Sequence, residues 1–392
     1  MQTFPAPAEQ PNRTICYKGK AGYRPGGLPP ACQCYMANRY YLKVKEVIRQ
    51  SPDAVTIHFW HPLSEQVRYQ PGQFLTFILN LDGQKVRRSY SMSSSPHTDV
   101  SLAVTVKRLP GGIVSGHLCD TVKPGDVIET LEPMGRFIPE LNAHNNRQYI
   151  LIGAGSGITP LMSMAKSILH VESQSRIWLI YGNRSPESII FRDELAQMEQ
   201  RHGARFRVTH VLTQPGSDWT GPTGRLNQSS LLKLLEAQPI DQLRTSFYYI
   251  CGPDGMMDEA RRALHLLEVP DSQVHRESFS TVPTGTEAHG EVTEDAATQA
   301  SDEQEVTVLY EGSEYKFKVE PHQTILEAAL ELDIDLPYSC QAGMCTACLG
   351  KCVSGKVKLD EEDGLSESEL KAGYVLTCVA HPIGHDVVIE IE

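Results

Sequence analysis

The stretch that decides the fold reads QYILIGAGSGITPLMSMAKSIL and spans residues 148–169. It begins with the strand-like run QYILI, passes through a glycine-rich turn, and continues with apolar residues at helical spacing. A strand that leads through glycines into a helix is the context of a phosphate-binding turn, because the helix N-terminus offers N–H groups and a positive dipole end. The stretch therefore predicts a parallel α/β domain with a dinucleotide site.

The region downstream repeats this alternation of strand and helix. The predicted strands read RIWLIY, RFRVTHVL and FYYIC, and the predicted helices between and after them read FRDELAQMEQ, SSLLKLLEA and GMMDEARRALHLL. Alternating elements of this kind indicate βαβ units and a mostly parallel, doubly wound sheet. We expect this NAD(P)-binding α/β domain to occupy residues 145–279.

The region upstream has a different texture. Its runs YYLKVKEVI, DAVTIHFW, QFLTFILNL and VSLAVTVKR alternate apolar and polar residues, and Pro-Gly and Asp-Gly turns separate them. Short strands with frequent turns predict a small antiparallel β-barrel over residues 39–144.

Two motifs in the predicted barrel suit a flavin nucleotide. In RRSYS, the guanidinium of Arg88 can pair with phosphate, the ring of Tyr90 can lie against the isoalloxazine, and Ser91 can hydrogen-bond it. Further on, TVKRLPGGIVS places glycines and Ser115 before a helical turn, as a pyrophosphate cradle does. Each motif alone is an ordinary strand or hairpin turn, but the two in order predict a flavin site.

Cys251 and Glu277 are candidates for the junction between nicotinamide and flavin. The run Cys251-Gly252-Pro253 ends the strand expected to be the last of the α/β sheet, where ligands of open sheets bind. Cys251 can pack beside the nicotinamide, or it can be a small buried residue. Glu277 can face the nicotinamide–flavin junction, or it can be a surface charge before the following segment.

Arg184 and Arg192 bear on the choice between NADPH and NADH. The second α/β strand runs into Arg184, and no acidic residue follows it directly to hold a ribose 2′-hydroxyl. Arginines at this place suit a 2′-phosphate, so the sequence favours NADPH. The alternative is that they form ion pairs with the neighbouring acids Glu187, Asp193 and Glu194.

The C-terminal part carries the strongest chemical signal. Residues 280–303 have linker composition, and residues 304–392 then contain strand-like EVTVLYEG and EYKFKV, a helix-like TILEAALELD, and a cysteine-rich loop. The four candidate metal ligands in this part are Cys340, Cys345, Cys348 and Cys378. The spacing C-x4-C-x2-C with a distant fourth cysteine is that of a plant-type [2Fe–2S] cluster. A structural zinc site also uses four thiolates and is the alternative.

Composition excludes several classes of function. The chain has 392 residues and a net charge of −12, which argues against nucleic acid as the main partner. No apolar run approaches the ~20 residues of a membrane-spanning helix, and the first residues lack a secretory pattern, so we expect a cytoplasmic protein. Residues 1–38 are interpreted as an N-terminal tail.

Taken together, the motifs resemble the ferredoxin–NADP reductase superfamily, and within it the members with a C-terminal plant-type ferredoxin domain. The resemblance runs from about residue 40 to the end and includes RRSYS, GAGSGITP, YICGPDGMMD and YSCQAGMCTACLGKC. It implies FAD on the barrel, NAD(P)H on the α/β domain and [2Fe–2S] in a β-grasp domain. It also implies flavin contacts by Arg88, Tyr90, Ser91, Val106, Lys107, Gly112 and Ser115, and nucleotide contacts by Gly155, Ser156, Gly157, Ile158, Thr159, Pro160, Arg184, Cys251, Gly252 and Pro253.

These parts predict a relay. NAD(P)H gives up two electrons together as hydride, an iron–sulfur cluster accepts one at a time, and a flavin can do both. We therefore expect electrons to pass from NAD(P)H through FAD and the cluster to a separate redox partner, an oxygenase component by analogy with relatives. The alternatives are a self-contained flavin reductase or sensor acting on a small molecule, and a non-enzymatic electron-carrier module.

Overall fold

The computed structural model describes residues 39–61, 67–81, 83–279, 304–341, 343, 345–361, 364–365 and 367–391. The predicted tail (1–38) and the predicted linker (280–303) lie outside the described residues. The described residues form three sheets, and each sheet corresponds to one of the folds expected from the sequence.

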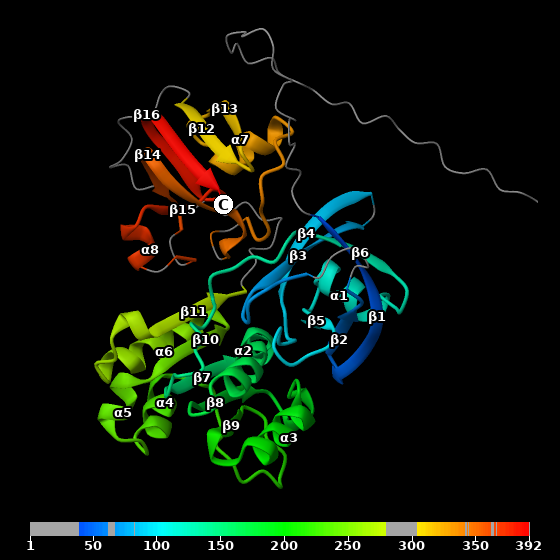
Figure 1. Cartoon of the computed structure of the whole chain (residues 1–392), viewed down its shortest axis with the longest axis vertical. Helices are drawn as coiled ribbons and strands as arrows, with labels where there is room; N and C mark the ends of the chain where they lie inside the picture. The colour runs from blue at the N-terminus through cyan, green and yellow to red at the C-terminus, as the bar shows by residue number, and fades with distance from the viewer. Residues whose placement is uncertain are drawn as a thin grey trace, which may run out of the picture. The chain divides into compact units, whose positions relative to one another are not determined.

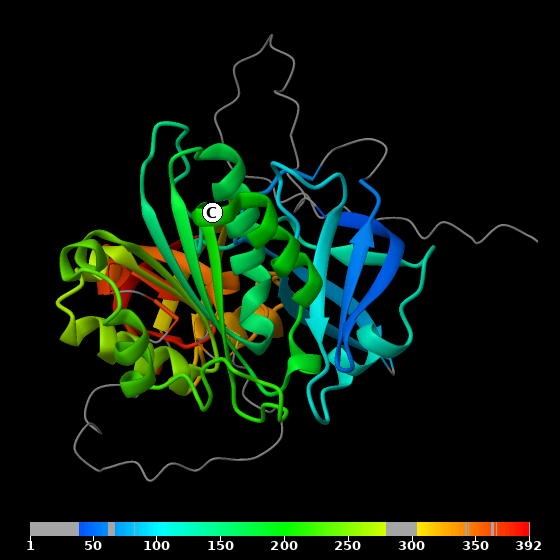
Figure 2. The same cartoon turned by 90° about the horizontal axis from the view of Figure 1, so that it is seen from below.

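The first sheet is antiparallel and follows the order β4-β3-β6-β1-β2-β5 (Figures 1 and 2, blue to cyan). Its strands are β1 (Tyr40–Ser51), β2 (Ala54–Phe59), β3 (Phe74–Leu81), β4 (Gln84–Ser91), β5 (Leu102–Lys107) and β6 (Val127–Thr130). Because side chains alternate along a strand, one face of each strand supplies the barrel core, which includes Phe59 and Phe77. Helix α1 (Ile113–Asp120) buries Leu118 in the same core. The predicted antiparallel barrel is confirmed.

The second sheet is parallel and follows the order β11-β10-β7-β8-β9. It contains β7 (Gln148–Ala154), α2 (Ile158–Val171), β8 (Arg176–Asn183), α3 (Arg192–His202), β9 (Phe206–Leu212), α4 (Gln228–Leu235), α5 (Ile240–Thr245), β10 (Phe247–Gly252), α6 (Asp254–Leu266) and β11 (Val274–Ser278). Helices α2 and α3 share one apolar core with the sheet, and α4, α5 and α6 share the other (Figure 1). The predicted doubly wound α/β domain is confirmed.

One detail of this sheet differs from the sequence prediction. The strand that ends at Gly252 is not the last one, because β11 follows it and pairs with it in parallel. The register sets Cys251 opposite Glu277. The run VHRES contains a single aliphatic residue because β11 is an edge strand, so it lacks the apolar signal of a central strand.

The third sheet follows the order β13-β12-β16-β14-β15. Its elements are β12 (Gln304–Tyr310), β13 (Ser313–Val319), α7 (Ile325–Glu331), β14 (Leu349–Leu359), α8 (Glu367–Lys371), β15 (Tyr374–Leu376) and β16 (Ala380–Ile391). Strands β12 and β16 run parallel at its centre, and α7 packs Ile325 and Leu326 onto the sheet core. The cysteine-rich loop follows α7, as the sequence predicts, whereas β14 and β15 between this loop and the closing strand β16 were not predicted.

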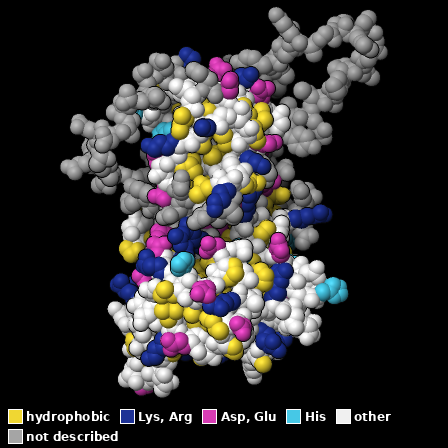
Figure 3. Space-filling view, turned by 90° about the vertical axis from the view of Figure 1, so that its left-hand side faces the viewer, with side chains coloured by type: hydrophobic (Ala, Val, Ile, Leu, Met, Phe, Trp, Pro, Cys, Tyr) yellow, Lys and Arg dark blue, Asp and Glu magenta, His cyan; other side chains and the backbone are white. Residues whose placement is uncertain are grey.

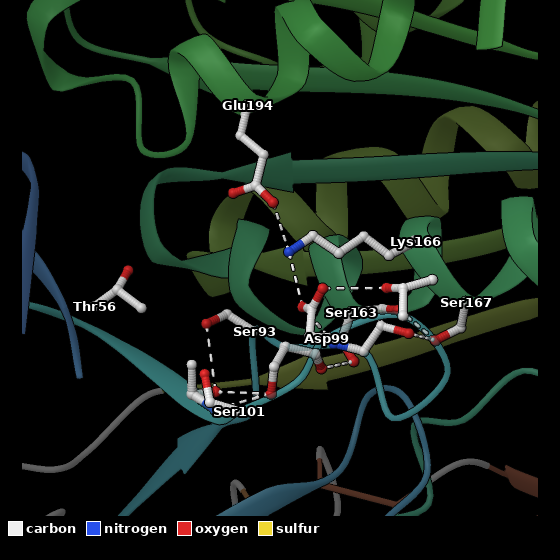
Figure 4. A network of polar contacts seen from close by, with 12 residues as sticks. Thr56, Ser93, Asp99, Ser101, Ser163, Lys166, Ser167 and Glu194 are labelled. Atoms are coloured by element: carbon white, nitrogen blue, oxygen red, sulfur yellow. Dashed lines mark hydrogen bonds and ion pairs between the residues drawn. The ribbon is translucent and has the colours of Figure 1, made fainter. Parts of the chain in front are cut away.

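A polar network joins the barrel to the α/β domain (Figure 4). The Lys166 ammonium on α2 lies 3.0 Å from Asp99, in the loop after β4, and 2.6 Å from Glu194 on α3. Burial alone lowers the pKa of Lys166, but the two carboxylates raise it above its ordinary value. Beside this ion pair the Ser163 hydroxyl donates to the Ser94 carbonyl oxygen at 2.6 Å. These contacts fix α2, whose N-terminus carries the glycine-rich turn, against the barrel.

Charged side chains of both signs lie on the surface. On the face drawn in Figure 3, acidic and basic side chains of the described residues are intermixed rather than gathered into a broad basic area. In the part of the chain that the structure describes, no helix has both the length and the apolar character that crossing a membrane requires.

Candidate functional site

A cavity that opens to solvent lies where the first two sheets meet the cysteine-rich loop of the third domain. Its walls come from the barrel, from the edge strand β11 with the one residue that follows it, and from the cysteine-rich loop. The lining residues are Phe74, Arg88, Ser89, Ser91, Glu277, Ser278, Phe279, Ser339, Cys340 and Cys345. Candidates predicted separately for the flavin, for the nicotinamide and for the metal are therefore neighbours around one cavity.

Strand β4 supplies the predicted flavin residues of the barrel. Tyr90 packs its ring against Phe77 with 5.3 Å between centroids, and burial raises the pKa of its phenol, so the hydroxyl stays protonated. Arg88 donates to the carbonyl oxygen of Arg87 at 2.7 Å and reaches the cavity wall. The Ser91 hydroxyl donates to Glu277 at 3.4 Å, which links the barrel directly to β11.

The second barrel motif forms a tight turn before α1. A β-carbon at Gly112 would stand 2.5 Å from the Ser115 hydroxyl, so a larger residue here would displace that hydroxyl. The Ser115 hydroxyl accepts from the Leu109 N–H at 3.1 Å. The Lys107 ammonium lies 3.6 Å from Asp53. The side chain of Val106 is fully buried in the barrel core, so only its backbone is available to a ligand.

The glycine-rich turn of the α/β domain is held against β10. Gly155 adopts φ +55°, and its carbonyl oxygen accepts from the Tyr181 hydroxyl at 2.8 Å. A β-carbon at Gly155 would stand 3.4 Å from the Lys107 Nζ, so a barrel cation lies beside this turn. A β-carbon at Gly157 would stand 2.0 Å from the carbonyl oxygen of Cys251. The turn and the end of β10 are thus packed as closely as glycine permits.

The buried Cys251 and the partly buried Glu277 lie opposite each other on β10 and β11, and both have raised pKa values. Burial raises the pKa of Glu277 to about 8, against an opposing hydrogen bond from Ser91. Burial, together with the Glu277 charge, raises the pKa of Cys251 well above its ordinary value. At neutral pH both groups therefore carry their protons. Glu277 is not the surface charge that the sequence left open as an alternative, because it lines the cavity.

Arg184 and Arg192 both lie exposed beyond the carboxyl end of β8. Glu194, one of the acids that the sequence offered as a partner, pairs with Lys166 instead. The pKa of the Glu187 carboxyl is lowered, mainly by hydrogen bonds from Ser185 and from a backbone N–H. The positive charge of Arg192 makes a smaller contribution in the same direction. Within the described residues, the guanidinium of Arg184 makes no ion pair.

The loop before β14 supplies three of the four predicted metal ligands, and Cys378, between β15 and β16, supplies the fourth. Cys340 and Cys345 line the cavity, whereas Cys348 and Cys378 lie buried behind them with their sulfurs 3.3 Å apart. Gly343 adopts φ +69°, and its N–H donates to the Cys378 sulfur at 3.4 Å, as expected for a loop whose backbone faces sulfur.

The chemistry of these thiols fits a metal cluster. Hydrogen bonding to Cys340, together with burial, raises the pKa of the Cys345 thiol, so thiolates here require nearby positive charge. Within the described residues, no three His, Cys, Asp or Glu side chains are arranged around a single-ion position. The sulfurs instead meet in contacts such as Cys348 with Cys378. Four thiolates shared between two irons are compatible with such pairing.

Sequence reasoning missed several residues of the cavity. Phe74 lies in a predicted barrel strand and Ser339 beside the first cysteine of YSCQAGMCTACLGKC, but neither was named as a site residue, and Phe279 directly follows β11. Arg87 was passed over in favour of Arg88, although the side chain of Arg87 is 2% exposed and contacts residues 335–338. The alternation of side chains along a strand could have identified Arg87, because two adjacent arginines point to opposite faces of the sheet.

Models of three protein families match the chain in the same order. The oxidoreductase FAD-binding domain matches residues 41–138, the oxidoreductase NAD-binding domain matches 151–262, and the 2Fe-2S iron-sulfur cluster binding domain matches 308–382. The fold and the site thus define a flavin- and nicotinamide-dependent oxidoreductase that carries its own iron–sulfur domain.

Full-length relatives narrow this class. A component of the 1,2-phenylacetyl-CoA epoxidase from Escherichia coli is 36% identical, over 91% of this chain and 99% of that protein. The ferredoxin reductase component of 3-ketosteroid-9-alpha-monooxygenase from Rhodococcus rhodochrous is 35% identical, over 89% and 96%. The reductase component of the glycine betaine monooxygenase from Pseudomonas aeruginosa is 31% identical, over 92% and 98%. The chain belongs to this family of ferredoxin reductase-type reductase components with a C-terminal 2Fe-2S domain, which confirms the resemblance seen in the sequence.

Solved structures support the fold. Phthalate dioxygenase reductase matches with a TM-score of 0.55 at 23% identity, over 90% of this chain and 98% of that chain. An intact type IV self-sufficient cytochrome P450 monooxygenase matches with a TM-score of 0.63 at 21% identity, over 90% of this chain and 41% of that chain. The three-part architecture is therefore shared with both.

Proposed function

We propose that this chain passes electrons from NADPH through FAD and a [2Fe–2S] cluster to a separate oxygenase component. The observation that carries the proposal is the common cavity, whose walls hold Arg88 and Ser91 of the barrel, Glu277 of the α/β sheet, and Cys340 and Cys345 of the cysteine-rich loop. An electron relay requires its donor, its intermediate and its acceptor to be adjacent, and this cavity makes the three candidate sites adjacent.

The barrel residues would hold and orient FAD. The backbone and side chains of β4 and of the turn before α1 would contact it through Arg88, Tyr90, Ser91, Val106, Lys107, Gly112 and Ser115. Bound FAD accepts hydride and releases electrons singly. The protonated Tyr90 phenol offers a hydrogen-bond donor, and the Ser91 hydroxyl, whose proton goes to Glu277, offers an acceptor, so neither places negative charge near the flavin site.

The α/β residues would hold the nicotinamide nucleotide. The turn Gly155-Ser156-Gly157-Ile158-Thr159-Pro160 would receive the pyrophosphate at the N-terminus of α2, helped by the adjacent Lys107 ammonium. The buried Cys251 and the partly buried Glu277, both protonated, would form with Gly252 and Pro253 the wall against which the nicotinamide lies. Neither side chain is assigned a proton-transfer step.

The preference for NADPH rests on Arg184 and Arg192. Both side chains are exposed at the end of β8, and Glu194 is occupied by Lys166. A 2′-phosphate would therefore meet available guanidinium groups there. Replacing each arginine by alanine should raise the KM for NADPH more than that for NADH. Arg201→Ala, an exposed position near the end of α3, is the matched control and should change neither KM.

The cluster would be held by Cys340, Cys345, Cys348 and Cys378. The test of the relay is an anaerobic titration of the purified protein with NADPH, followed by flavin absorbance and by electron paramagnetic resonance. We expect the flavin band to bleach and a reduced [2Fe–2S] signal to appear. Bleaching without any cluster signal, or zinc in place of iron in the metal analysis, would refute the relay.

The oxygenase partner is inferred from the relatives, each of whose names places it in an oxygenating enzyme system. Reconstitution with candidate oxygenase components should couple NADPH oxidation to substrate oxygenation. If the purified chain alone turns over NADPH with a small-molecule acceptor at full rate, and no oxygenase component raises that rate, the chain is a self-contained reductase instead.

A further inference from the structure

Two arginines on the barrel side contact the 2Fe-2S domain in the same chemical way. The first is Arg87 on β4, whose guanidinium pairs with the Asp335 carboxylate. It also donates to the carbonyl oxygen of Leu336 at 3.2 Å and lies 4.4 Å above the ring of Tyr338. These three partners belong to the segment that leads into Cys340, the first cysteine of the cavity wall.

The second is Arg136, in the segment after β6. Its guanidinium lies 3.9 Å above the ring of Tyr374, the first residue of β15, and 3.9 Å from the Glu369 carboxylate on α8. Each arginine thus meets one carboxylate and one tyrosine face. Arg39 adds a further link, because it pairs both with Asp335 and, at 2.7 Å, with Glu129 of the barrel.

Because Arg87 is buried, its guanidinium depends on the groups of the 2Fe-2S domain for its hydrogen-bond and charge partners. Its side chain is only 2% exposed, and a guanidinium is removed from water at a large penalty unless carboxylate, carbonyl and aromatic groups compensate it. Here the 2Fe-2S domain supplies all three kinds of group. The charge balance agrees, because residues 305–392 hold 17 Asp and Glu against 6 Lys and Arg.

We propose that Arg87 and Arg136 are positioning residues that dock the 2Fe-2S domain onto the barrel with Cys340 and Cys345 facing the flavin side of the cavity. This inference rests on the proposed electron relay. Its consequence is that passage of electrons from the barrel to the cluster depends on two guanidinium contacts that touch neither cofactor site directly. Hydride transfer into the barrel does not depend on them.

The test uses the full-length protein carrying its flavin and cluster, with Arg87→Gln, Arg136→Gln and the double variant. Arg68→Gln removes an exposed barrel arginine and is the control. Hydrogen–deuterium exchange is measured over residues 335–341 and 369–376. We expect exchange to rise about tenfold over 335–341 in Arg87→Gln and over 369–376 in Arg136→Gln, over both in the double variant, and over neither in the control.

A kinetic readout accompanies the exchange measurement. In stopped-flow mixing with NADPH, the double variant should bleach its flavin at the wild-type rate but reduce its cluster more slowly. Arg87→Lys, which keeps the charge but loses the planar fork, should fall between wild type and Arg87→Gln. If Arg87→Gln fails to fold, Asp335→Asn removes the same contact from a carboxylate that is 45% exposed, and Arg39→Gln, measured beside it, gives the share that belongs to the Arg39 pair with Asp335.

The outcomes separate this inference from the relay itself. Wild-type exchange in every variant, with unchanged cluster reduction, overturns the docking role of the arginines. If NADPH reduces no flavin even in the wild type, the relay is wrong, and the exchange measurement still decides whether the arginines dock the domain.

Discussion

Replacing Gly157 by alanine perturbs the closest approach in the nucleotide-binding turn. A β-carbon at this position would stand 2.0 Å from the carbonyl oxygen of Cys251, whereas ordinary van der Waals contact begins at 3.4 Å. The neighbouring atoms are backbone of β10, which is paired on both sides in the sheet and cannot rotate away as a side chain can. The turn and the strand must therefore separate by roughly 1.4 Å.

The expected effect on stability follows from this overlap. Overpacking of a close-packed interior costs about 1–3 kcal/mol, and we place Gly157→Ala at the upper end because backbone rather than side chain must move. For a domain of this size, about 3 kcal/mol corresponds to a fall in Tm of roughly 6–12 °C. The same displacement should weaken NADPH binding, because the N–H groups of the turn lose their alignment.

Gly255 provides the matched control within the same domain. It lies in the first turn of α6, and a β-carbon there would meet nothing within 4 Å. Gly255→Ala should therefore leave NADPH binding unchanged and raise stability by about 0.5–1 kcal/mol, because alanine favours the helix. Differential scanning calorimetry and isothermal titration with NADPH measure both quantities. An unchanged Tm and an unchanged Kd in Gly157→Ala would refute the reasoning.

Three further changes test other parts of the site. Glu277→Gln should gain stability relative to wild type by up to ~4 kcal/mol as pH rises from about 4.5 to 8. The reason is that the folded wild-type protein keeps the proton of this carboxyl up to about pH 8, whereas the unfolded chain loses it near pH 4.5. Parallel curves of Tm against pH for the two proteins would contradict this prediction. Cys348→Ser should abolish the visible absorbance of the cluster while Cys352→Ser keeps it, and the reverse result would reassign the ligands. Lys166→Met leaves two carboxylates facing each other and should lower stability by about 1–2 kcal/mol in urea titrations, whereas Lys233→Met, at an exposed position of α4, should change it by less than about 0.5 kcal/mol.

Local pattern was sufficient to predict most of the fold. The alternating runs upstream of residue 108 became barrel strands, and the glycine-rich turn became the entry to α2, because hydrophobic periodicity acts within each element. The four-residue strand β6 and the edge strand β11 were missed. Both are short, and an edge strand needs little apolar character to pair with its neighbour.

The candidate site was predictable in its parts but not in its assembly. The spacing of the cysteines predicted a cluster, and RRSYS predicted a flavin contact, because each is set within a few residues. That Cys340, Ser91 and Glu277 surround one cavity depends on packing between residues far apart in the sequence, which no local pattern encodes. For Val106 the family resemblance indicated a flavin contact, and the structure adds that its side chain lies in the barrel core. Such a contact would therefore be made by the backbone of Val106.

The tyrosine and carboxylate contacts of Arg87 and Arg136 would be too weak to hold two separate proteins together. In this chain residues 280–303 join the two sides covalently, so association is unimolecular and the local concentration of the domain reaches ~1 mM or more. The docking contacts then act on a domain that is already held nearby. Contacts of the same strength between two separate chains would have to overcome the entropy of association as well.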